Sequence, residues 1–151
     1  MPKIPKVIHF CWFGGAEYPD LIKNCMASWE KYLPEYEIVK WSEENFDVNC
    51  NQYVKEAYEN KKWAFITDYV RLYALYNYGG VYLDSDVEVL KPIDEFLDNE
   101  AFSGFESRDT VPTAIMASVK GQRFMGELLH DYDNRKLILE DGSIDMTANT
   151  V

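Results

Sequence analysis

The sequence predicts an α/β fold in which a parallel sheet is covered by helices. The first observation is the order strand, helix, strand, helix over residues 6–60, which is typical of such a sheet. The second is a helix expected over residues 62–78, whose apolar side chains occupy most of its circumference and which should be largely buried. The third is the stretch at 81–89, VYLDSDVEV, which predicts a buried strand carrying two carboxylates to its end.

The individual elements follow from local patterns. Residues 6–13, KVIHFCWF, are rich in β-branched and aromatic residues and predict a central first strand. Apolar residues at helical spacing predict a helix over 18–32, which Pro34 stops. The other expected elements are a strand at 35–41, a helix N-cap at Ser42 with Asn45 in the capping-box position, a helix at 52–60, a helical turn at 92–97, strands at 101–105 and 113–117 around a loop at 108–112, and a helix at 122–132.

The two aspartates of the 81–89 strand are the main candidates for chemistry. Side chains two apart in a strand point to the same face, so Asp84 and Asp86 should project together. Such a pair is costly unless a cation neutralises it, and carboxylate oxygens suit Mg²⁺ or Mn²⁺. An EF-hand loop is excluded because Glu88 and Val89 occupy its fifth and sixth positions. A solvated surface pair is one alternative, and a haloacid-dehalogenase-type phosphatase with Asp84 as nucleophile is another.

Two further features lie outside that strand. Asp68 and Arg71 are three residues apart in the buried helix, so they should be neighbours on one face. Buried charges are rarely left unpaired, and a structural ion pair and a functional site fit this spacing equally well. Trp12 comes at the end of the first strand, where open α/β sheets bind ligands. It is placed to stack on a flat ligand, with core packing as the alternative.

Composition narrows the class of protein. At 151 residues, with 47% hydrophobic residues, the chain fits one domain spanning 1–151. Lys plus Arg is 15 and Asp plus Glu is 26, and the net charge of −11 argues against nucleic acid or an anionic membrane as main partner. Three cysteines without a CxxC favour free thiols in a reducing compartment. No stretch approaches a signal peptide or a membrane span, so a cytoplasmic protein is expected, and His9 and His130 are expected to be structural.

Taken together, the segments IPKVIHFCWFGG and ITDYVRLYALYNYGGVYLDSDVEVLKPID resemble the sugar-binding DXD region of family 32 glycosyltransferases. That family includes yeast-type initiating mannosyltransferases and bacterial capsule and lipopolysaccharide sugar transferases, and the large clostridial glucosylating toxins share the arrangement. The resemblance spans residues 4–96. It implies a GT-A-like fold, with a Rossmann-like mixed sheet flanked by helices. It also implies metal-dependent, retaining transfer of a hexose from a nucleotide-diphosphate sugar to a glycan or lipid-linked acceptor in surface polysaccharide synthesis.

The resemblance also implies roles for the candidate residues. Asp86 would coordinate Mn²⁺ or Mg²⁺ directly, and Asp84 would contact the ion through water and touch ribose or sugar hydroxyls. Asp68 would hydrogen-bond sugar hydroxyls, and Arg71 would bind hydroxyls or the diphosphate. The nucleotide base, in a UDP- or GDP-hexose, would stack on Trp12.

Two points qualify what the resemblance implies. Tyr82 matches the aromatic residue two positions before the first aspartate of the motif, where core packing is the alternative. Family members usually run well beyond 200 residues, and the missing part normally supplies acceptor contacts. A donor-binding but catalytically incomplete module is therefore an alternative to an enzyme. The surface left by a missing part would favour homo-oligomers, and contact with a membrane would be peripheral, through partners.

Overall fold

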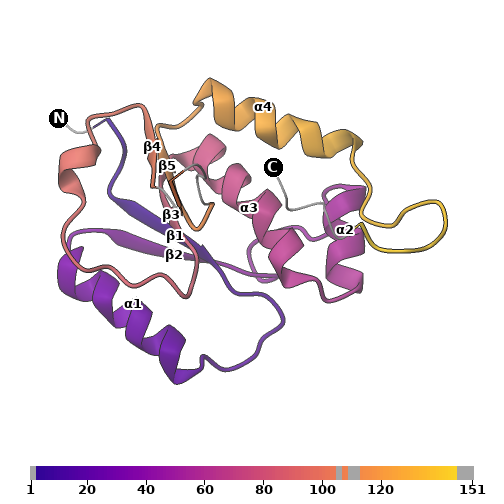
Figure 1. Cartoon of the computed structure of the whole chain (residues 1–151), viewed down its shortest axis with the longest axis horizontal. Helices are drawn as coiled ribbons and strands as arrows, with labels where there is room; N and C mark the ends of the chain where they lie inside the picture. The colour runs from indigo at the N-terminus through magenta and orange to yellow at the C-terminus, as the bar shows by residue number, and fades with distance from the viewer. Residues whose placement is uncertain (1–2, 105–106, 109–112, 146–151) are drawn as a thin grey trace.

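The computed structural model describes residues 3–104, 107–108 and 113–145. Within them, a mixed sheet is sandwiched between helices (Figure 1). The elements are β1 (Val7–Cys11), α1 (Asp20–Tyr32), β2 (Glu37–Trp41), α2 (Gln52–Glu59), α3 (Trp63–Tyr78), β3 (Gly80–Leu83), the 3₁₀ turn η1 (Asp94–Phe96), β4 (Ala101–Ser103), β5 (Ile115–Ser118), α4 (Arg123–Asp131) and the 3₁₀ turn η2 (Tyr132–Asn134).

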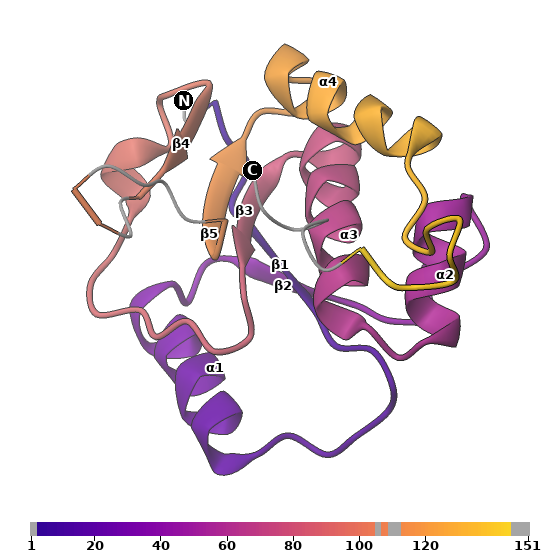
Figure 2. The same cartoon turned by 45° about the vertical axis from the view of Figure 1, so that its right-hand side comes forward.

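The strand order β2-β1-β3-β5-β4 makes the sheet mixed, because β1 lies parallel to β2 and β3, whereas β5 is antiparallel to both β3 and β4. The parallel arrangement that the first four elements predicted holds for β2, β1 and β3, and the antiparallel β5 and β4 confirm the mixed sheet that the family resemblance implied. Helix α1 covers one face, and α2, α3 and α4 cover the other (Figure 2). Because β1 and β3 are parallel, their carboxyl ends meet at the same edge of the sheet.

Side chains alternate between the two layers as strand geometry requires. On the α1 face, Ile8, Val81 and Ala117 are in register across three strands and are fully buried. On the opposite face, Tyr82 pairs in register with His9, and the buried helix α3 packs over this side. The prediction that α3 is largely buried is confirmed, since eight of its sixteen residues are buried.

Helix α3 and β3 are joined by Gly79 and Gly80, which require the freedom of glycine. Their φ angles are +71° and +125°, in a region that side chains disfavour. A Cβ on Gly80 would lie 2.6 Å from the carbonyl oxygen of Val7. The Gly79 carbonyl accepts a hydrogen bond of 2.9 Å from the buried ring of His9. This tight turn sends the chain from α3 directly into β3, so the helix and strand that carry the candidate site lie side by side.

The predicted helix at Ser42 does not form. Asn45 Oδ1 accepts from the Ser42 amide, and Ser42 Oγ accepts from the Glu44 amide, so the reciprocal capping bonds are present. The chain nevertheless makes only turns at 42–46, and the next helix begins after Asn51, whose side chain caps α2. Poor helix formers between the two caps and the packing of buried Phe46 against the ring of Trp41 explain the interruption.

Other element boundaries differ from the predictions by a few residues. The predicted strand at 113–117 is β5, which begins at Ile115, and β4 ends at Ser103. Phe105 and most of the loop predicted at 108–112 lie outside the described residues. No helix in the described part of the chain is both long enough and apolar enough to cross a membrane.

Candidate functional site

The candidate site begins where β3 ends. The strand stops at Leu83, and the Asp84 amide donates to the carbonyl of Ala114 at 2.8 Å, which fixes the first aspartate beside β5. The chain then turns, with the Val87 amide donating to the Asp84 carbonyl at 3.0 Å. The prediction that Asp84 and Asp86 sit on one face of a strand through 89 is therefore wrong. The DXD segment is a turn.

Helix α1 explains why the strand does not continue. The indole N–H of Trp29 donates to the Val87 carbonyl at 2.8 Å, and the Val89 amide donates to Ser28 Oγ at 2.8 Å. Side chains of α1 thus satisfy backbone groups that a longer strand would have paired with a neighbour. Val89 is buried against this layer, so its apolar character reflects packing on α1.

Strand alternation does apply to Tyr82 and Asp84. Both point to the α3 side of the sheet, and the Tyr82 hydroxyl donates to Asp84 Oδ1 at 2.9 Å. Burial raises the pKa of Tyr82 well above its usual value, so the phenol stays protonated and serves as donor. The guanidinium of Arg71 lies 4.7 Å from the centre of the Tyr82 ring. Tyr82 is therefore both a core residue and a support for the first aspartate.

Arg71 joins the helix to the DXD turn. Its two terminal nitrogens donate to Asp68 Oδ1 and to Asp84 Oδ1, each at 3.0 Å. The pairing of Asp68 with Arg71 that their spacing predicted is confirmed, and the bridge to Asp84 is new. Arg71 is only 5% exposed. Burial opposes its charge, but Tyr82, Asp84 and Asp68 outweigh that effect and raise its pKa above the ordinary value. One buried cation thus holds two carboxylates.

The cluster is incompletely satisfied. Within the described residues, the buried atoms Asp68 Oδ2 and Arg71 Nε have no hydrogen-bond partner. Burial raises the pKa of Asp68 to about 6, with the nearby Asp84 adding to the effect and Arg71 opposing it. Buried polar atoms are normally paired, and perturbed carboxylates gather at functional sites. The arrangement can therefore accept hydrogen bonds from a polar ligand that enters beside Asp68.

The carboxylates of the DXD turn fit a divalent ion shared with a ligand. Asp84 uses Oδ1 for Arg71 and Tyr82, and its side chain is 31% exposed, while Asp86 is exposed. The described residues contain no group of three or more potential metal ligands. Mg²⁺-type ions are commonly held by one or two carboxylates, with water and substrate phosphates completing the shell. Asp84 and Asp86 suit that mode and do not form a closed protein cage.

Trp12 follows the last residue of β1, at the same edge of the sheet as Asp84. Its indole N–H donates to the carbonyl of Ala16 at 2.7 Å, and its ring packs edge-on against Tyr18 at 5.0 Å. The ring is half-buried and is oriented by these two contacts. Its stacking on a nucleobase stays a prediction.

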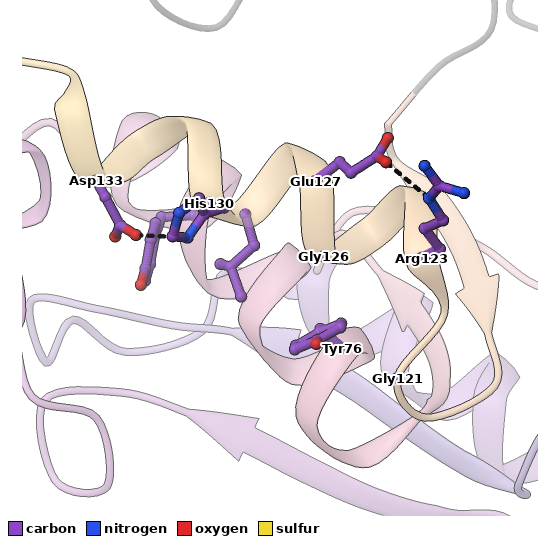
Figure 3. Close-up of a pocket in the computed structure, with 9 residues that line it drawn as sticks. Tyr76, Gly121, Arg123, Gly126, Glu127, His130 and Asp133 are labelled. Carbon is purple, nitrogen blue, oxygen red and sulfur yellow. Dashed lines mark hydrogen bonds and ion pairs between the residues drawn. The ribbon is translucent and has the colours of Figure 1, made fainter.

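A cavity of about 690 Å³ lies elsewhere, between α3 and α4 (Figure 3). Its rim carries the ion pairs Arg123–Glu127 and His130–Asp133, and the ring of Tyr76 lies under Gly126. None of the site residues predicted from the sequence lines it. Its size alone does not make it the place of chemistry, because none of the unpaired buried atoms of the described residues belongs to its lining, whereas two of them belong to Asp68 and Arg71.

Sequence patterns missed two tyrosines near Asp68. Tyr53 on α2 and Tyr132 in η2 pack edge-on at 4.9 Å, and the Asp68 carboxylate contributes to raising the pKa of each, after burial. Tyr53 comes before the DXD motif in the sequence and Tyr132 comes after it, and both lie too far from it for a short sequence motif to include them. The signal that could have marked Tyr53 as buried is its helical spacing with Val54 and Ala57, which are also buried.

The fold and the site place the chain in a known class. The chain belongs to the family described as glycosyltransferase sugar-binding regions containing a DXD motif, whose model matches residues 19–103. The match includes the turn at Asp84 and Asp86 and the Asp68–Arg71 pair.

Several individual proteins are similar to it. It is 29% identical over 136 residues to inositol phosphoceramide mannosyltransferase 3 of Schizosaccharomyces pombe, covering 85% of this chain and 37% of that protein. It is 29% identical over 126 residues to the mannosyl phosphorylinositol ceramide synthase SUR1 of Saccharomyces cerevisiae, covering 78% of this chain and 31% of the relative. The chain thus spans about a third of the length of the curated relatives it matches.

Among solved structures, the PaToxG glycosyltransferase aligns with a TM-score of 0.66 at 18% identity, over 85% of this chain and 59% of that one. A likeness at this level of identity concerns the fold. Together with the five-stranded mixed sheet and its flanking helices, it confirms the expected GT-A-like fold class.

Proposed function

We propose that this chain is the donor-binding part of a metal-dependent family 32 hexosyltransferase, which transfers the sugar with retention of anomeric configuration. The observation that carries the proposal is the Asp68–Arg71–Asp84 cluster. It places a buried cation between two carboxylates at the carboxyl end of β3, next to the DXD turn. Two of its buried atoms have no partner among the described residues, and unpaired buried groups in a native structure call for an explanation such as a ligand or a bound water.

The chemistry of the donor assigns a task to each side chain. Asp84 and Asp86 would hold Mn²⁺ or Mg²⁺, and such an ion neutralises the negative charge that develops on a departing nucleoside diphosphate. Arg71 offers N–H groups to the diphosphate or to sugar hydroxyls. Asp68, when ionised, accepts hydrogen bonds from hydroxyls of the hexose. Tyr82 holds Asp84 in place through its neutral phenol.

The hexose and the acceptor are proposed from the relatives. The two relatives described above are named as an inositol phosphoceramide mannosyltransferase and a mannosyl phosphorylinositol ceramide synthase. We therefore propose mannose as the hexose, carried by GDP, and a lipid-linked acceptor. A glycan of a surface polysaccharide is the alternative acceptor, and UDP-glucose represents the alternative donor.

A catalytically incomplete, sugar-nucleotide-binding module is the second candidate. The chain matches 37% of one mannosyltransferase relative and 31% of SUR1, so the activity of the whole relatives does not pass to it by similarity alone. The donor cluster lies within the part shared with them. Binding of donor and transfer to acceptor must therefore be measured separately.

Calorimetry tests donor binding. The chain is titrated with GDP-mannose, UDP-glucose and GDP, each with and without Mn²⁺. We expect one nucleotide sugar to bind in the presence of Mn²⁺ and at least tenfold more weakly without it. If no nucleotide or nucleotide sugar binds with Mn²⁺ present, both candidate functions are wrong.

A product assay then separates the candidates. Inositol phosphoceramide and a polysaccharide fragment are offered as acceptors, and the anomeric configuration of any product is read by NMR. Transfer supports the enzyme, and binding without transfer supports the module. Phosphate release from a general phosphatase substrate, abolished in Asp84→Asn, would instead support the phosphatase that the Asp-x-Asp pattern also allowed.

We also propose that the protein acts in the cytoplasm, at the inner face of the membrane, through its lipid-linked acceptor and its partners. Flotation with vesicles that contain the acceptor lipid, compared with vesicles that lack it, tests this location. Gel filtration at high protein concentration tests whether the chain forms the homo-oligomer expected from its sequence. Elution as a monomer would count against that expectation.

A further inference from the structure

The hydroxyl of Tyr53 is an unexplained polar group in the core. Tyr53 belongs to α2 and is 0% exposed, and among the described residues its Oη has no hydrogen-bond partner. Burying a hydroxyl without a partner is costly, and a phenylalanine would fill the same space without that cost. The presence of the hydroxyl therefore calls for an acceptor close to it.

Asp68 supplies an acceptor of the required kind. Its Oδ1 pairs with Arg71, but its buried Oδ2 has no partner within the part of the chain that the structure describes. Helix α2, which carries Tyr53, packs beside α3, which carries Asp68 (Figure 2). The Asp68 carboxylate is close enough to contribute to the raised pKa of Tyr53, after burial and Tyr132. A buried donor without an acceptor thus neighbours a buried acceptor without a donor.

The other charged and titratable groups around this pair are accounted for. Arg71 and Asp84 face Asp68 from its own helix and from the end of β3. Tyr132, Arg135 and Asp145 face Tyr53 from η2 and the segment that follows it. None of them makes a described hydrogen bond to Asp68 Oδ2. Among the described residues of α2, Tyr53 carries the buried side-chain donor that has no partner.

We propose that Tyr53 is a positioning residue for Asp68. Its hydroxyl donates to Asp68 Oδ2 through one buried water, because the two atoms make no direct hydrogen bond, and so keeps Oδ1 directed at Arg71. Each carboxylate oxygen can accept a second hydrogen bond, which leaves Asp68 able to accept from a ligand as well. The consequence for ligands rests on the proposed function, in which Asp68 contacts the hexose. Tyr53 then affects affinity for the sugar portion of the donor and has little effect on affinity for the nucleoside diphosphate alone.

The contact itself is tested without any ligand, by a double-mutant cycle in thermal unfolding. We expect Tyr53→Phe to lower Tm by a few degrees in the wild-type background and to leave it unchanged or raise it in Asp68→Asn. Tyr69→Phe is the matched control, because Tyr69 is also buried in this aromatic cluster but its hydroxyl lies near Cys50. An equal shift of Tm in both backgrounds would overturn the proposal.

Ligand binding separates positioning from a general packing role. With Mn²⁺ present, Tyr53→Phe should weaken binding of GDP-mannose, or of whichever nucleotide sugar the wild type binds, at least fivefold and that of its nucleoside diphosphate less than twofold. Tyr69→Phe should change neither. Equal weakening of both ligands, or of neither, would contradict the positioning role. If the wild type binds no nucleotide, the proposed function fails, while the unfolding cycle still decides whether Tyr53 and Asp68 interact.

Discussion

Strand β3 has a buried polar cluster at each end, and the two differ in how fully they are paired. At its start, the imidazole of His9 lies between Trp41 and the Gly79 carbonyl. At its end, Arg71 lies between Asp68 and Asp84. Both clusters occupy the face of the sheet that the α2–α4 layer covers, and both connect segments far apart in sequence.

The cluster at the start of β3 is complete. The Trp41 indole N–H donates to His9 Nδ1 at 3.1 Å, so Nε2 carries the ring proton and donates to Gly79 at 2.9 Å. Burial lowers the pKa of His9, which keeps the ring neutral. The cluster at the end of β3 is charged and leaves two buried atoms without partners in the described residues. The difference suits the first cluster to a structural role and the second to the ligand-binding role proposed above.

The largest expected effect comes from removing the cation of the second cluster. Arg71→Met should destabilise the protein by about 3–5 kcal/mol, because the buried carboxylate of Asp68 and the partly exposed one of Asp84 lose their shared partner. It should also abolish binding of nucleotide sugars. Chemical denaturation and calorimetry measure the two effects. Arg123→Met is the control, since that arginine is exposed in an i,i+4 pair and its loss should change neither quantity much. Similar small effects for both variants would refute the special role of Arg71.

Breaking the first cluster should separate stability from binding. His9→Phe leaves the Trp41 N–H and the Gly79 carbonyl without a partner and should cost about 2–4 kcal/mol of stability. The affinity of the folded variant for a nucleotide sugar should stay within about twofold of wild type, since the His9 imidazole is bound to Gly79, at the opposite end of β3 from the DXD turn. Binding is measured well below the variant's Tm. A loss of affinity as large as that of Arg71→Met would erase the distinction between the clusters.

Asp68→Asn should stabilise the protein at neutral pH, in contrast to Arg71→Met and His9→Phe, which should destabilise it. The pKa of Asp68 rises from 3.8 to about 6 on folding, so the folded state binds the proton more tightly. Wild-type stability therefore falls as pH rises from about 4 to about 6, by up to about 3 kcal/mol. The asparagine variant lacks this loss and should be more stable than wild type at pH 7 but not at pH 4. Chemical denaturation at pH 4 and pH 7 measures the stability of the variant relative to wild type. A stability difference that is the same at both pH values would contradict the prediction.

The contribution of His9 to stability should depend on pH in the opposite sense to that of Asp68. Because burial lowers its pKa below the ordinary 6.5, the unfolded state binds the proton more tightly. Its contribution to stability is complete above pH 6.5 and is lost as pH falls below that value. The stability gap between wild type and His9→Phe should therefore narrow in acid. A gap that widens between pH 7 and pH 5 would show that the ring is not held neutral.

The smallest effect on stability belongs to Asp86. The side chain is exposed in the turn after β3, so Asp86→Ala should change stability by less than about 0.5 kcal/mol. If it holds the divalent ion, the Mn²⁺ dependence of donor binding disappears. Glu88→Ala, an exposed carboxylate two residues further along, is the matched control and should bind normally. Intact Mn²⁺-dependent binding in Asp86→Ala would mean that the ion is held elsewhere.

Much of the fold could be predicted because its signals are local. The burial of α3, the Asp68–Arg71 neighbourhood and the Gly79–Gly80 turn follow from helical period, spacing and the conformational freedom of glycine. The helix at Ser42 was predicted wrongly from an equally local signal. Its capping bonds form, but the packing of Phe46 and the following turn residues prevail over the helix.

The sequence by itself determined the candidate residues of the site and the order in which they come, because residue type and short spacing can be read directly along the chain. Tertiary structure decided where β3 ends, since α1 side chains pair the backbone of 87–89 from outside. It also decided that Arg71 bridges to Asp84 and that Tyr53 lies near Asp68. Those contacts join α2, α3 and the DXD turn across many residues, and burial acts on charges only after such segments have packed together.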